Sequence, residues 1–174
     1  MALTPDEPLR IWVAPKDALD QGRFFELPGE MVFHVGNAHE DGDEIVLSYA
    51  GNPGNQFLGG AAVDVMRGHL TNDGDSLLRI ARLNLRTGAA RVQTLAEGSN
   101  VEFPQIDPRR VGLAARWLVM PAGWARREAL QFSGVQVVDT HSGAVQRFDY
   151  GGDFLPEEHI VVPRPGSTQE LDGW

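Results

Sequence analysis

Short stretches of alternating apolar and polar residues, separated by Gly, Pro, Asn and Asp, run along the whole chain. Alternation with a period of two over roughly four to eight residues predicts β-strands, because successive side chains of a strand point to opposite faces. We therefore expect an all-β chain with strands at 10–14, 23–27, 31–35, 44–50, 77–85, 90–95, 115–120, 130–138, 144–150 and 160–162. Segment 61–70 fits either a short helix or an irregular crossing.

Three ionisable side chains lie within otherwise apolar strand segments. In 31–35, alternation places Phe33 and Val35 on one face and His34 on the other, where it is the polar side chain of an otherwise apolar strand. A hydrogen-bonded core histidine and a metal ligand both fit that position. Glu102 and Glu158 also lie in short apolar segments, where charges at strand edges are the simplest interpretation.

One turn occurs twice. Residues 83–89 (LNLRTGA) and 138–144 (VDTHSGA) each end a strand in Asn or Asp, place Thr or Ser before Gly, and begin a second strand. Their spacing of 55 residues resembles the period of a propeller blade. Because a stand-alone propeller needs at least four blades, the 174 residues predict about three blades of a larger ring.

Composition excludes several classes of function. The chain has 15 Lys and Arg against 24 Asp and Glu, a net charge of −9, which argues against binding nucleic acid. The absence of Cys excludes disulfides and thiolate metal sites. No apolar run approaches the roughly 20 residues of a transmembrane helix, and the first residues show no secretory signal. A nucleophile elbow and a phosphate-binding glycine loop are also absent.

Ordered motifs covering nearly the whole chain resemble those of the carotenoid cleavage oxygenase family. The family pattern F-H-x-x-N-A-[YW]-E, followed by an acidic turn and an apolar strand, is similar to EMVFHVGNAHEDGDEIVL at 30–47. Further family-like segments are LRIWVAPK at 9–16, RFFELP at 23–28, VEFPQID at 101–107, EHIVVPR at 158–164 and ELDGW at 170–174. The resemblance implies a seven-bladed β-propeller, of which residues 1–174 form an incomplete segment.

The resemblance also implies a site. The family holds non-haem Fe(II) with four His, and His34 matches one of these ligands. Three Glu of the family accept hydrogen bonds from iron-bound His, and Glu102 and Glu158 match two of them. We therefore expect a dioxygenase that uses O₂ to split a conjugated double bond of a hydrophobic carotenoid or apocarotenoid into two carbonyl products.

The chain departs from the family in ways that limit this expectation. It carries one matching ligand of four, His39 replaces an aromatic residue, and Leu171 replaces Asp. We expect the chain alone to be inactive and not to retain iron. Alternatives are a stilbene-cleaving enzyme of the same family, a non-catalytic β-propeller interaction module, and an unrelated all-β domain. A complete protein could contact a membrane surface; its compartment depends on the source, cytoplasm in bacteria or plastid in plants and algae.

Overall fold

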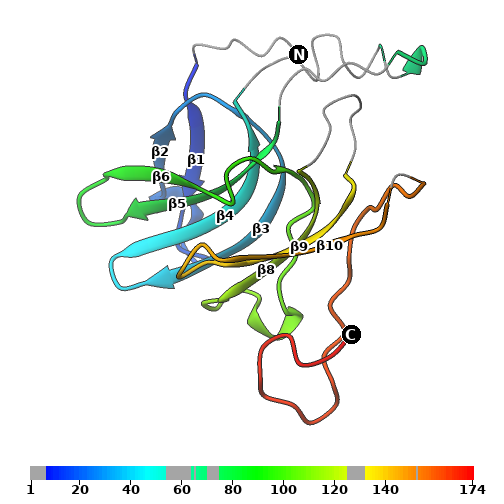
Figure 1. Cartoon of the computed structure of the whole chain (residues 1–174). Coiled ribbons are helices and arrows are strands. Elements are labelled where there is room, and N and C mark those ends of the chain that lie inside the picture. Colours follow the sequence, from blue (N-terminus) through cyan, green and yellow to red (C-terminus); the bar gives the residue numbers. More distant parts are fainter. Residues whose placement is uncertain (1–6, 54–63, 65, 70–74, 125–131, 152) are drawn as a thin grey trace.

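Three antiparallel sheets follow one another along the chain in a computed structural model that describes residues 7–53, 64, 66–69, 75–124, 132–151 and 153–174 (Figure 1). The first sheet pairs β1 (Leu9–Val13) with β2 (Arg23–Leu27). The second has the order β3-β4-β5-β6, with strands Met31–Asp41, Glu44–Asn52, Leu77–Asn84 and Ala90–Leu95. The third has the order β10-β9-β8-β7, with strands Val145–Asp149, Gly134–Asp139, Trp117–Gly123 and Asn100–Val101. Two 3-10 turns, Leu19–Gln21 and Pro108–Arg110, complete the described elements.

Strand β5 of the second sheet is buried on both faces, because successive side chains of a strand point to opposite faces and each face contributes to a core. Leu78 and Ile80 of β5 face the third sheet, where they join a core that includes Leu118 and Met120. The residues between and after them point the other way, and Ala81 belongs to the core formed with the first sheet. The three sheets therefore stack like successive blades.

The repeated turn predicted from the sequence is confirmed. In the β5–β6 turn, the Gly88 amide donates to the Asn84 carbonyl at 2.9 Å, and in the β9–β10 turn the Gly143 amide donates to the Asp139 carbonyl at 2.8 Å. Both glycines adopt positive φ, +79° and +74°, a conformation that costs other residues free energy. The same turn thus closes the last hairpin of two successive sheets.

Several strand predictions need correction. Strand β3 continues to Asp41, the short β7 was not predicted, and β8 lies two to three residues later than expected. No strand forms at 160–162; instead, one isolated bridge joins Pro163 to Gly173. Residues 61–63, 65 and 70 of segment 61–70 and residues 130 and 131 of predicted strand 130–138 lie outside the described residues.

The prediction that Phe33 and Val35 pack opposite His34 is wrong. The two residues are 45% and 56% exposed. The β3–β4 register shifts between Val32 and His34 and again between Val35 and Asn37. Such irregularities bend a strand and re-aim its side chains, so simple alternation fails around His34.

A carboxylate–guanidinium pair fixes the segment near the last residues of the chain. Asp107, which is fully buried, binds the Arg109 guanidinium and accepts a hydrogen bond from the Leu171 amide at 3.1 Å. Arg109 in turn donates to the carbonyls of Ser167 and Gln169. The Arg109 guanidinium holds the pKa of the Asp107 carboxyl well below its ordinary value. This pair, which we call the Asp107 clamp, therefore attaches segment 167–171 to the connection between β7 and β8.

Candidate functional site

His34 lies on an edge strand, because β3 pairs only with β4 in the second sheet. Its backbone is opposite Ala50, between the two register shifts of the β3–β4 pair. The side chain is 38% exposed. An imidazole placed on an open edge beside a bulge is accessible to a ligand, unlike a core histidine.

The imidazole is bonded to a carboxylate from the neighbouring sheet. Nδ1 of His34 lies 3.0 Å from Oε2 of Glu102, which directly follows β7. A carboxylate can only accept, so in the neutral form of the imidazole this hydrogen bond places the ring proton on Nδ1 and leaves the lone pair on Nε2. Among the described residues, none is hydrogen-bonded to Nε2. Glu102 therefore fixes the orientation of the ring through Nδ1 and leaves Nε2 available.

Phe103 packs against the same imidazole. Its ring centroid lies 4.3 Å from that of His34, with 44° between the planes. Phe103 has φ of +49°, a conformation that is unusual for a bulky residue and that clusters at functional sites. This backbone turn lets consecutive residues, Glu102 and Phe103, both contact His34.

The second oxygen of Glu102 is also bonded. Oε1 accepts a hydrogen bond from the Ser76 hydroxyl at 2.8 Å. The Glu102 side chain is 13% exposed, and its position between two partners meets the requirement that a buried carboxylate be hydrogen-bonded. Sequence reasoning missed Ser76, which precedes β5 and carries no recognisable motif; Phe103 was within a quoted motif, but its contact with His34 was not anticipated.

Glu158 lies apart from the pair. Its exposed carboxylate accepts a hydrogen bond from Gln105 Nε2 at 3.4 Å, and none of the described histidines is hydrogen-bonded to it. Gln105 is three residues after Glu102 and bridges to Val119. The structure thus joins His34 with Glu102 and connects Glu158 only to the segment that follows Glu102.

These residues fit one ligand position of an iron centre. A neutral imidazole is a common iron ligand, and a carboxylate on its other nitrogen is the usual support of a metal-bound His. Among the described residues, however, no group of three or more His, Cys, Asp and Glu side chains is placed to hold a metal. The described part of the chain therefore does not contain a complete metal centre.

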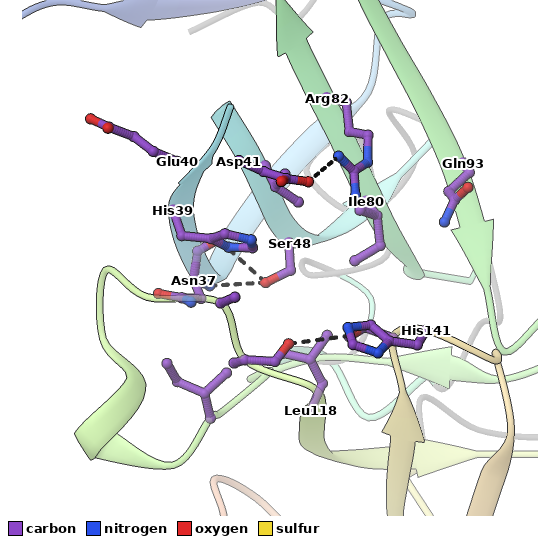
Figure 2. A pocket seen from close by; sticks show the side chains of 15 residues that line it. Asn37, His39, Glu40, Asp41, Ser48, Ile80, Arg82, Gln93, Leu118 and His141 are labelled. Carbon is purple, nitrogen blue, oxygen red and sulfur yellow. Dashed lines mark hydrogen bonds and ion pairs between the residues drawn. The ribbon is translucent and has the colours of Figure 1, made fainter. Parts of the chain in front are cut away.

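A cavity of about 250 Å³ lies between the second and third sheets, and His34 is not among its lining residues (Figure 2). His39 of β3 and Ile80 of β5 line it from the second sheet, and Leu118 of β8 and His141 of the β9–β10 turn line it from the third (Figure 2). Burial lowers the pKa of His39, against the opposing effect of Asp41. Charged side chains, Asp41 and Arg82 among them, also line the cavity, and none of the sequence motifs identifies an occupant.

Comparison with known proteins places this geometry in context. The family model described as retinal pigment epithelial membrane protein (RPE65) matches residues 1–174. The carotenoid 9,10(9',10')-cleavage dioxygenase 1 of Pisum sativum is 32% identical over 94% of the chain, and the apocarotenoid-15,15'-oxygenase of Synechocystis is 30% identical over 98%. The chain spans about a third of these curated relatives, 32% and 34% of their lengths.

Solved structures show the same fold. Cobalt-substituted Synechocystis ACO (apocarotenoid oxygenase) superposes with a TM-score of 0.85 at 23% identity, covering 98% of the chain and 35% of that structure. An ACO/RPE65 chimera gives a TM-score of 0.78 at 22% identity with the same coverage. These are β-propeller structures, so the predicted fold class is confirmed: the chain is an all-β propeller segment. No helix among the described residues is both long and apolar enough to cross a membrane.

Proposed function

The chain belongs to the carotenoid cleavage oxygenase family, and on that premise we propose that it is a segment of a non-haem Fe(II)-dependent dioxygenase acting on a carotenoid or apocarotenoid. The observation that carries the proposal is the 3.0 Å bond between His34 Nδ1 and Glu102 Oε2. It leaves one imidazole nitrogen available on an open strand edge, as a metal ligand requires.

Each residue of the pair has a distinct task. His34 supplies one nitrogen donor to iron through Nε2. Glu102 holds the Nδ1 proton and so keeps the ring in the tautomer that binds a metal. Phe103, packed 4.3 Å from the imidazole, restricts rotation of the ring. Together they present a donor that needs little reorganisation when the centre assembles.

The reaction adds both atoms of O₂ across a conjugated carbon–carbon double bond, which breaks to give two carbonyl groups. Bound iron supplies the site at which O₂ becomes reactive. The contribution of this chain is the surface beside the ligand, where Phe33 and Val35 are substantially exposed on either side of His34 in sequence. Apolar side chains at that place suit a hydrophobic polyene.

Residues 1–174 act in this proposal as an incomplete propeller segment. One imidazole does not hold iron, so further ligands must come from polypeptide outside the segment.

Six large apolar side chains in the third sheet and after it are more than half exposed: Phe148, Phe154, Leu155, Ile160, Val162 and Trp174. We name these six residues the C-terminal apolar set and propose that they pack against a further blade of a whole protein. Glu158 would then support an imidazole from that part.

A graft tests the function. The aligned third of the Synechocystis apocarotenoid-15,15'-oxygenase is replaced by residues 1–174, and cleavage of an apocarotenoid and of a stilbene is followed by the carbonyl products. We expect apocarotenoid cleavage by the graft and none by the 174-residue chain alone. Preferential stilbene cleavage would favour the stilbene-cleaving enzymes of the same family. A folded, inactive graft without iron would favour an interaction module.

A further inference from the structure

Ser76 and His34 are hydrogen-bonded to the two oxygens of the Glu102 carboxylate. The Ser76 hydroxyl donates to Glu102 Oε1 at 2.8 Å, and Glu102 Oε2 bonds His34 Nδ1 at 3.0 Å. A carboxylate has no proton to donate, so the hydroxyl proton of Ser76 is directed to Glu102. The three side chains form a continuous hydrogen-bonded chain that crosses from the second sheet to the third and back.

Ser76 is itself held rigidly. It is only 6% exposed and directly precedes β5. Its amide donates to Asn100 Oδ1 at 2.9 Å, and its carbonyl accepts from the Val101 amide at 2.9 Å. These two bonds fix the Ser76 backbone against β7, next to Glu102 in the chain.

The terminal torsion of a Glu side chain is broad, so one hydrogen bond leaves the carboxylate considerable freedom to rotate. A second bond to the other oxygen restricts that rotation and keeps Oε2 directed at His34. Hydrogen bonds in such chains also polarise one another. Loss of the hydroxyl would therefore weaken the His34–Glu102 bond although neither residue had changed.

We propose that Ser76 is a positioning residue: it fixes the Glu102 carboxylate and thereby holds His34 with Nδ1 protonated and Nε2 free for a metal. This inference rests on the proposed function for the role of the metal. The hydrogen-bonded chain itself makes a prediction without any metal, namely that the tautomer of His34 depends on the Ser76 hydroxyl.

The test uses ¹⁵N NMR of the histidine side chains in the metal-free 174-residue chain, at a pH where the imidazoles are neutral. Ser76→Ala removes the hydroxyl, and Ser76→Thr retains it. Ser48→Ala is the matched control, because buried Ser48 also bonds to β3, through Asn37, but is not hydrogen-bonded to Glu102. A second readout is the iron affinity of the graft that carries the same substitutions.

Wild type should show His34 mainly as the Nδ1–H tautomer. Ser76→Ala should lower the ratio of this tautomer to the Nε2–H form about fivefold, as expected for one hydrogen bond, and should weaken iron binding, whereas Ser76→Thr and Ser48→Ala should stay near wild type. An unchanged ratio in folded Ser76→Ala would overturn the proposal, as would an equal change in Ser76→Thr or Ser48→Ala. A wild-type chain with the Nε2–H tautomer would contradict the His34–Glu102 pair itself. If the tautomer ratio changes as expected in the 174-residue Ser76→Ala chain but the graft binds no iron, only the proposed function is contradicted.

Discussion

His34 on β3 and Glu102 after β7 are 68 residues apart and belong to different sheets, yet their side chains meet at 3.0 Å. The direction of the imidazole therefore depends on how two successive sheets pack. A substitution that disturbs the interface between the two sheets should therefore change the orientation of His34 before it unfolds either sheet.

Removal of the Glu102 carboxylate should weaken metal binding without unfolding the chain. In the graft, we expect Glu102→Ala to lower iron affinity about 10- to 100-fold, the usual effect of losing the support of a metal-bound histidine. Titration of apo graft with Fe(II) under anaerobic conditions measures it. Glu158→Ala should lower affinity as well if Glu158 supports another ligand. Wild-type affinity in Glu102→Ala would remove Glu102 from the site.

Addition of one methyl group at Gly36 should strain the interface of the two sheets. A Cβ at this position would lie 2.8 Å from Ser48 Oγ and 3.2 Å from both Leu118 and Pro104. We expect Gly36→Ala to lower the free energy of unfolding by about 1–3 kcal/mol, as overpacking does, and to lower iron affinity in the graft. Urea unfolding measures the first effect. Unchanged stability would show that the sheets separate easily at this point.

The two repeated turns should respond alike to the loss of glycine. Gly88 and Gly143 have positive φ and no neighbouring atom closer than 3.6 Å to an added Cβ. Gly88→Ala and Gly143→Ala should therefore each cost about 1–2 kcal/mol, the penalty of the left-handed conformation alone. Thermal or urea unfolding of both variants checks this. A cost several times larger in one variant would mean that the turns differ in more than sequence.

Stability should decline in acid as the Asp107 clamp is lost. The folded-state pKa of Asp107 lies below its ordinary value of 3.8, chiefly because Arg109 donates to the carboxylate. As the pH falls, the unfolded chain therefore binds this proton first, so the stabilisation is complete above about pH 5 and is lost as the pH falls through 3.8 and below. Urea midpoints between pH 7 and pH 2 should fall, and less steeply in Asp107→Asn. Parallel curves for the two proteins would contradict the assignment.

The C-terminal apolar set should make the 174-residue chain self-associate and bind a hydrophobic dye, because exposed apolar surface of this kind marks interaction sites. Ile160→Ser combined with Trp174→Ser should lower both effects. The matched control is Leu19→Ser, since Leu19 is 69% exposed but lies outside the set. Light scattering and dye fluorescence measure the response. Equal effects of the control would show that the set has no special role.

Periodicity predicted most strands, because apolar alternation reports local geometry, and the repeated glycine turns predicted two matching hairpins. Periodicity did not predict the exposure of the residues around His34, because the register shifts of β3 depend on pairing with β4 and not on the residues of β3 alone. The resemblance pointed to His34 and Glu102 separately, but their contact requires two sheets to pack. Ser76 had no sequence signal, because a serine before a strand acquires its role only when Glu102 is brought to it.

The iron content of the graft decides whether His34 is a metal ligand. Purified graft protein is analysed by atomic emission, together with its His34→Ala and His39→Ala variants; His39 lines the cavity between the sheets and is not hydrogen-bonded to Glu102. We expect about one iron per chain in the graft and in His39→Ala, and little in His34→Ala. Full iron occupancy in folded His34→Ala would contradict this expectation.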